Sequence, residues 1–183
     1  MRRFISVDLE TSGLDPRRHE IIEVGLVIEE ESGGLSEVEF SLPFDERRAS
    51  AEALSINGWG TREFPPVKDP GLAVGMLCEI LDGVHIVGKN PQFDTGFLTA
   101  LFARFGEEPR WHHRLVDVGM LAWGRFNAHH DGSPPWQQPP NSELLLEWHG
   151  LPADGLHSAL ADARWAYQVF RECVPRLDVA ASV

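Results

Sequence analysis

Residues 4–14, FISVDLETSGL, predict a β-strand in which two carboxylates interrupt an apolar run before a turn at Gly13. Side chains two positions apart on a strand lie on the same face, so Asp8 and Glu10 should point to the same side of a sheet. Two like charges at that spacing repel each other unless a cation lies between them. The stretch therefore predicts either a cation site or the solvent-facing side of an edge strand.

The next segments extend this strand into a sheet. A β-branched run covers residues 21–28, and residues 38–42 alternate apolar and polar side chains after two glycines. The first forty residues therefore predict an antiparallel meander. Beyond it, apolar periodicity predicts a helix over residues 72–81, a strand over 84–87 and a helix over 94–105. This order predicts an α/β fold with a mixed sheet, antiparallel and then parallel, covered by helices.

The last third of the chain begins with a predicted loop. Residues 127–140 contain four prolines and are a candidate substrate-side insertion. Asn141 or Ser142 should cap a short helix that ends at Trp148, and a final helix should cover residues 158–173.

Composition is that of a globular protein. The chain has 183 residues, of which 43% are hydrophobic, and we expect one domain over residues 1–175 with a short tail at 176–183. No segment reaches the roughly 18 apolar residues of a membrane helix, and the first residues lack the apolar core of a signal peptide. We therefore expect a cytoplasmic protein without a membrane partner. Cys78 and Cys173 are isolated, which favours buried thiols over a disulfide framework.

The formal net charge of −12 argues against tight, sequence-independent coating of nucleic acid duplexes. Bound divalent cations can nevertheless invert the local sign of a cleft lined by carboxylates, so that a phosphate can enter it. The acidity is compatible with a metal site and does not establish one.

Three further residues could join Asp8 and Glu10. Asp94 follows the predicted strand over residues 84–87, a position typical of a helix N-cap. His157 and Asp162 lie five residues apart around the start of the last helix, where both can face a common cleft. A surface histidine and a carboxylate near a helix N-terminus would explain them individually.

The three segments in combination decide between these explanations. Residues 8–14 (DLETSGL), 90–94 (NPQFD) and 157–163 (HSALADA) occur in this order along the chain. Together they resemble the three motifs of the DEDDh 3′-5′ exonucleases, relatives of the proofreading subunit of bacterial replicative polymerases. The resemblance extends from residue 4 to about residue 172 and implies an RNase H-like fold.

By this resemblance, four carboxylates would hold two Mg²⁺ or Mn²⁺ ions. Asp8 would bridge the ions, Glu10 and Asp162 would complete their ligands, and Asp94 would contribute directly or through water. Two ions about 3.5 to 4 Å apart can activate a water and stabilise the leaving 3′-oxygen, and oxygen ligands suit these metals. His157 would be the general base, because an imidazole can accept a proton near neutral pH.

The resemblance also implies residues that contact substrate. Hydroxyls after the first motif could meet a phosphate or sugar, and apolar side chains could stack on a terminal base, although core packing would explain the latter equally well. Asn57 lies in a segment that resembles the lining of the nucleotide pocket. The expected substrate contacts are Leu9, Thr11, Ser12, Leu14, Asn57, Asn90 and Phe97.

The leading hypothesis is a metal-dependent 3′-5′ exonuclease that releases nucleoside 5′-monophosphates from single-stranded or frayed DNA. Any proofreading would occur in trans with a DNA polymerase. Trimming of RNA 3′ ends or of short oligoribonucleotides is the alternative within the fold, and a catalytically silent nucleic-acid-binding module is the alternative outside enzymology. A zinc site at residues 112–113 or 129–131 is disfavoured, because neighbouring histidines on a strand point to opposite faces and no cysteine lies nearby.

Overall fold

The computed structural model describes residues 3–30, 33–128, 138–152 and 157–174. Within these residues, five strands form a mixed sheet in the order β3-β2-β1-β4-β5. The central strand β1 pairs antiparallel with β2 and parallel with β4, which confirms the predicted α/β sheet. The strands are β1 (Phe4–Thr11), β2 (Ile21–Glu29), β3 (Leu35–Ser41), β4 (His85–Gly88) and β5 (Val116–Asp117).

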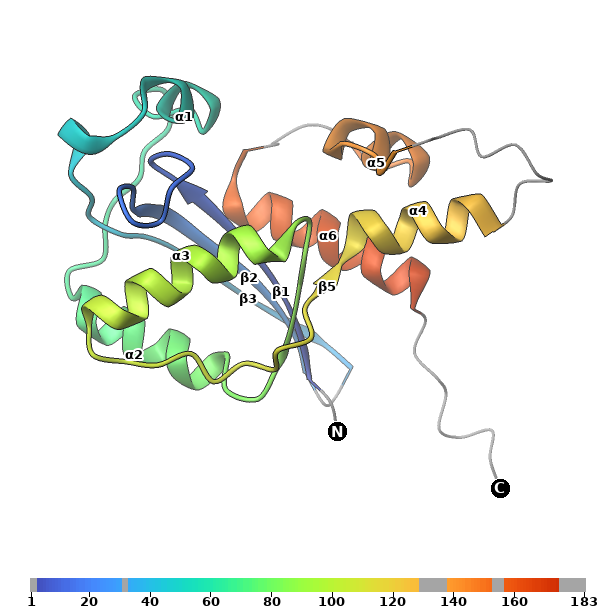
Figure 1. Ribbon diagram of the computed structural model, residues 1–183, viewed down its shortest axis with the longest axis horizontal. Coiled ribbons are helices and arrows are strands. Elements are labelled where there is room, and N and C mark those ends of the chain that lie inside the picture. The colour runs from blue at the N-terminus through green and yellow to red at the C-terminus, as the bar shows by residue number, and fades with distance from the viewer. Residues whose placement is uncertain (1–2, 31–32, 129–137, 153–156, 175–183) are drawn as a thin grey trace.

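Helices cover both faces of this sheet (Figure 1). Ile5, Val7 and Leu9 on β1 enter a core shared with α2 and α3, whereas the opposite face of the sheet packs against α4, α5 and α6. Because side chains alternate along a strand, Asp8 and Glu10 belong to the face covered by α6. The helices are the 3₁₀ helix η1 (Glu46–Arg48), α1 (Ala51–Ile56), α2 (Pro70–Ile80), α3 (Pro91–Arg104), α4 (Val118–Ala128), α5 (Ser142–Trp148) and α6 (Ala159–Cys173).

Helix α3 starts earlier than the sequence pattern predicts. It begins at Pro91, a residue whose fixed φ suits the first helical position. The N-cap is Asn90, with a left-handed φ of 53° and no side-chain capping bond. Asp94 is therefore a buried residue of the first turn, and the interpretation of Asp94 as an N-cap is wrong.

Elements α1, β5 and α4 are not predicted from the sequence pattern. Helix α4 contains Gly119 and Gly124, and glycine lowers intrinsic helix propensity. Val118 and Ala122 on this helix are buried in the core shared with α6, so tertiary packing stabilises the helix.

The segment around the predicted proline-rich loop is only partly described. Asn127 and Ala128 end α4, and the Asn141 side chain caps α5 by accepting the Leu144 N–H at 2.9 Å, as predicted. Residues 129–137, with one of the two considered histidine groups, lie outside the described residues, as does the expected tail at 176–183. No helix in the described part of the chain is long and apolar enough to cross a membrane.

The other histidine group does not lie on a strand. The rings of His112 and His113 stack with centroids 4.4 Å apart in the segment before β5, and His112 also lies 4.0 Å from the ring of His85. The argument that the two neighbours point to opposite faces is therefore wrong, because the loop backbone lacks the alternation of a strand. Within the described ranges, the residues grouped closely enough to hold a metal are Glu10, His157 and Asp162.

Candidate active site

The end of β1 carries the first two carboxylates of the site. Asp8 lies opposite Gly25 of β2, and Glu10 lies opposite Glu23. A methyl group at Gly25 would come within 2.2 Å of the Ala159 backbone, so this glycine permits the close approach of α6 to the sheet. The first turn of α6 therefore lies directly over the Asp8 and Glu10 side of β1.

Asp94 reaches the same region from α3. Its side chain is 3% exposed, and burial raises its pKa to about 7 even though hydrogen bonds from its own backbone N–H and that of Leu9 lower the pKa. Since β1 extends beyond the end of β4, the Leu9 backbone can meet this carboxylate in place of a strand neighbour. Asp94 is thus fixed against β1.

The third contribution comes from the turn into α6. His157 has a left-handed φ of 68°, and its backbone N–H donates to Asp162 Oδ2 at 3.2 Å. The indole Nε1 of Trp165 donates to the other oxygen of Asp162 at 3.0 Å. These two bonds orient the Asp162 carboxylate, and a ring nitrogen of His157 lies within 4.8 Å of carboxylate oxygens of Glu10 and Asp162.

The four carboxylates interact strongly with one another. Burial raises the pKa of Asp8 well above its usual range, and Asp94, Asp162, Glu10 and Glu23 raise it further. Burial also raises the pKa of Glu10 to about 8, with Asp162 and Glu23 adding to the effect, and burial raises the pKa of Asp162. The fold therefore gathers negative charge that a cation would relieve.

An apolar cavity of about 230 Å³ adjoins Glu10. Leu14 is 81% exposed at this cavity, and Ile56 and Phe93 also line it. Phe97 is only 2% exposed and packs in the core with its ring centroid 5.0 Å from that of Phe93. Phe93, four residues earlier on α3, is therefore the aromatic side chain at the cavity.

The remaining expected contacts occupy different surroundings. Leu9 and Thr11 line the cavity, and the Thr11 hydroxyl donates to the Gly13 carbonyl at 2.8 Å. The Ser12 hydroxyl is buried and accepts the Glu20 N–H at 2.9 Å. Asn57 is buried and its amide donates to the Thr11 carbonyl at 3.3 Å, which joins the end of α1 to the end of β1. Asn90 is exposed at the start of α3.

Two residues that the sequence interpretation did not select also belong to this region. Glu23 is 4% exposed beside Glu10, and the Arg62 guanidinium donates to both Glu23 oxygens at 2.9 and 3.0 Å. Glu23 lies in the β-branched run of β2, where a carboxylate is as anomalous as at Asp8 and Glu10. That anomaly was the available signal, whereas no local pattern marks Arg62.

The convergence of the three segments matches a known family. The family model described as RNase_T: Exonuclease covers residues 5–170, a span that includes all four carboxylates and His157. The chain belongs to the exonuclease family. The predicted membership of the DEDDh exonucleases is confirmed. No curated protein matches the chain.

Solved structures with the same fold include E. coli exonuclease I. Its complex with a dT13 oligonucleotide has a TM-score of 0.71 and 17% identity, covering 94% of this exonuclease and 41% of that chain. The zinc-bound form of the E. coli exonuclease I complex with single-stranded DNA has a TM-score of 0.74 and 18% identity, covering 95% and 40%. This exonuclease thus spans about two fifths of exonuclease I, and the likeness confirms the RNase H-like fold.

Proposed function

We propose that this chain is a metal-dependent 3′-5′ exonuclease that shortens single-stranded DNA and releases nucleoside 5′-monophosphates. The observation that carries the proposal is the convergence of four carboxylates and His157 beside an apolar cavity. Support for the substrate comes from E. coli exonuclease I, whose fold this chain shares and whose structure contains a DNA oligonucleotide.

The chemistry of the four carboxylates supports the binding of divalent cations, and we infer two ions. Asp8, Glu10, Asp94 and Asp162 offer the hard oxygen ligands that Mg²⁺ and Mn²⁺ prefer. Arg62 relieves part of their mutual repulsion, since it lowers the pKa of Glu10 and Asp162. Bound there, two such ions would polarise the attacking water and stabilise the leaving 3′-oxygen.

The side chains around the carboxylates accept the proton, orient Asp162 and contact the terminal base. His157 accepts the proton of the attacking water, since its exposed imidazole lies next to Glu10 and Asp162. Trp165 keeps an oxygen of Asp162 turned toward α6 through its indole N–H. Leu14 and Phe93 contact the terminal base through apolar surface, which accepts every base.

Shortening Leu14 tests the role of the cavity. We expect Leu14→Ala to raise the KM for a single strand about tenfold with kcat nearly unchanged, because base stacking contributes about 1–3 kcal/mol per base. The matched control is Leu35→Ala, which shortens another exposed leucine on β3. An unchanged KM in Leu14→Ala would show that the base does not contact this side chain.

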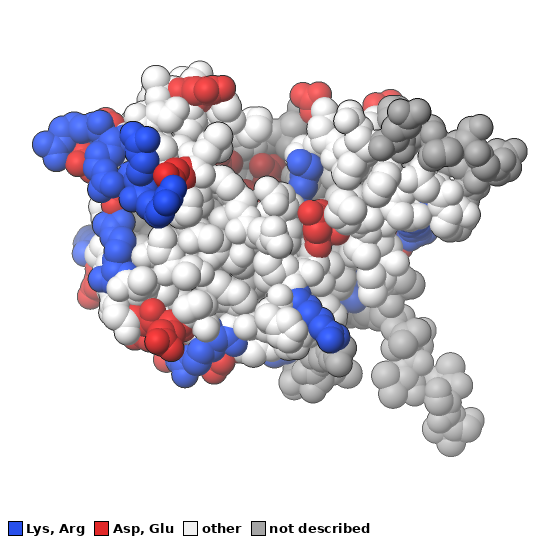
Figure 2. All heavy atoms as spheres, viewed as in Figure 1, with Lys and Arg blue, Asp and Glu red and all other residues white. Residues whose placement is uncertain are grey.

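A group of arginines adjoins this region of the acidic chain. Figure 2 shows basic side chains gathered over η1 and the loop between β1 and β2, beside the hollow that contains acidic ones. We call Arg17, Arg18, Arg47 and Arg48 the arginine corner; all four are exposed. Arg17 and Arg47 are 88% and 89% exposed, whereas their partners Asp15 and Asp45 are 31% and 33% exposed. The guanidinium groups therefore form the outer surface of the arginine corner, where the phosphate backbone of a DNA single strand would pass.

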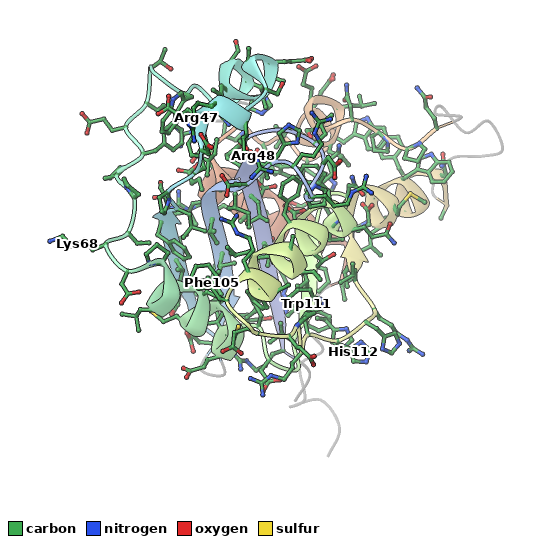
Figure 3. The ribbon with its side chains drawn as sticks, turned by 60° about the vertical axis from the view of Figure 1, so that its left-hand side comes forward. Arg47, Arg48, Lys68, Phe105, Trp111 and His112 are labelled. Carbon is green, nitrogen blue, oxygen red and sulfur yellow. The ribbon has the colours of Figure 1, made fainter. Side chains whose placement is uncertain are left out.

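The salt dependence of DNA binding tests whether the DNA backbone passes over the arginine corner. We expect the Arg17→Ser, Arg47→Ser double variant to weaken binding of a fluorescent single strand and to lower the slope of log Kd against log salt by about 1.4, or about 0.7 for each phosphate contact. Anisotropy in Ca²⁺ measures both quantities. The control is Arg110→Ser, Arg114→Ser, which removes the same charge beside Trp111 and His112, far from Arg47 and Arg48 (Figure 3). Equal slopes for the two double variants would refute the path.

The decisive experiment offers the protein 5′-labelled single-stranded DNA and RNA with Mn²⁺ or with EDTA. We expect a ladder of shortened, still labelled DNA products in Mn²⁺ and none in EDTA. A strong preference for RNA would instead identify an exoribonuclease. Binding without shortening of either strand would identify a catalytically silent module and refute the proposal.

A further inference from the structure

Glu23 caps the helix that carries Asp162. Helix α6 has Ser158 at its N-cap, but that side chain makes no capping hydrogen bond. The Glu23 carboxylate instead accepts the Ala159 N–H at 3.1 Å across 136 positions of sequence. Because a helix begins with unpaired N–H groups, a buried carboxylate at this point fixes where α6 starts on the sheet.

Arg62 holds that carboxylate and the neighbouring turn together. Its guanidinium binds both Glu23 oxygens, donates to the Asn57 carbonyl at 3.3 Å and donates to the His157 carbonyl. The Arg62 guanidinium also lies over the Phe64 ring, with Cζ 4.6 Å from the ring centroid. One side chain thus joins β2, the end of α1 and the turn into α6.

The backbone of that turn needs an external partner. His157 has a left-handed φ of 68°, a conformation that costs free energy for residues other than glycine and persists where surrounding contacts hold it. On one side, the His157 N–H binds Asp162, and on the other, its carbonyl binds Arg62. Both peptide groups of His157 are therefore fixed, which sets the direction of its imidazole.

We propose that Arg62 is a positioning residue that, through Glu23 and the His157 carbonyl, holds the His157 imidazole toward Glu10 and Asp162. The inference rests on the proposed function only in taking His157 as the base. Since the guanidinium already binds four oxygens of the protein, it acts on the turn, and through its charge on Glu10 and Asp162, and not on a phosphate of the substrate. Loss of Arg62 should therefore lower kcat and leave KM nearly unchanged.

The test compares Arg62→Ala, Arg62→Lys and the control Arg164→Ala. Arg164 forms a similar two-bond pair with Glu37, at 2.7 and 2.6 Å, from the same helix α6. Single-turnover rates and KM for a DNA strand are measured at saturating Mn²⁺ for each variant in the parent protein and in the His157→Ala background. The His157 ring signals are recorded by NMR without substrate, so that this readout does not depend on turnover.

We expect Arg62→Ala to lower the rate constant about 10- to 100-fold in the parent and less than about twofold in His157→Ala, because positioning of a lost base has no effect. Lysine should restore part of the rate, since it retains the charge but not the fork. The His157 signals should shift in Arg62→Ala and not in Arg164→Ala. An equal loss in both backgrounds, a loss confined to KM, or unmoved His157 signals would overturn the proposal. An inactive parent with shifted His157 signals would refute the proposed function and leave the positioning role supported.

Discussion

Asp8→Ala should abolish exonuclease turnover without unfolding the protein. The pKa of Asp8 is raised by burial and by Asp94, Asp162, Glu10 and Glu23, so a cation would relieve the repulsion on its carboxylate. Metal ions contribute several kcal/mol to such reactions, and each 1.36 kcal/mol is a factor of ten in rate. We expect a loss of about a thousandfold or more in the labelled-strand assay.

Asp8→Ala should lose activity but should not lose stability. Removal of a half-buried charge from a group of like charges lowers the free energy of the folded state without metal, so the melting temperature in EDTA should stay the same or rise by about 2 to 4 °C. Asp8→Asn, which keeps the shape, controls for lost packing, and Glu79→Gln controls for removal of an exposed carboxylate on α2. A melting temperature well below that of the parent would show that Asp8 is a structural residue and not a metal ligand.

The sequence alone predicts the part of the site that depends on local geometry. Alternation along a strand is enough to place Asp8 and Glu10 on one face, and the five-residue spacing is enough to bring His157 near Asp162 at a helix start. The antiparallel meander follows from the apolar patterns of the first forty residues in the same way. These features can be predicted because each depends on only a few neighbouring residues.

The remainder depends on contacts between distant segments. Helical periodicity cannot distinguish Phe93 from Phe97, because residues four positions apart lie on the same face of a helix. Only the packing of α3 against β1 buries one of them. The partnership of Glu23 with Ala159 spans 136 positions, and Arg62 joins it from a segment without periodic structure. The need for glycine at position 25 likewise follows only from the packing of α6 over it.

The cluster also predicts how stability depends on pH when metal is absent. The pKa of Glu10 is raised to about 8 and that of Asp94 to about 7 in the folded protein, mainly by burial, and those of Asp8 and Asp162 are raised as well. A carboxyl group with a raised folded pKa binds its proton more tightly when folded. Its contribution to stability is therefore complete below its unfolded pKa of about 4 and is lost as pH rises through the folded value.

In EDTA, the melting temperature should therefore fall between about pH 5.5 and about pH 8, and saturating Mn²⁺ should remove most of that fall, because the ions bind the ionised carboxylates of the folded state. The window lies above the range in which Asp15, Glu20 and Asp45 titrate, since arginine contacts lower the pKa of Asp15 and Asp45 and hydrogen bonds to the Asp45 N–H and Arg104 lower that of Glu20. Scanning calorimetry of the parent and of Asp8→Asn would measure the slope. If the EDTA slope were flat or positive in the parent, or equally steep in Asp8→Asn, the carboxylates would not repel one another in the folded chain, and the main physical argument for a cation between them would be lost.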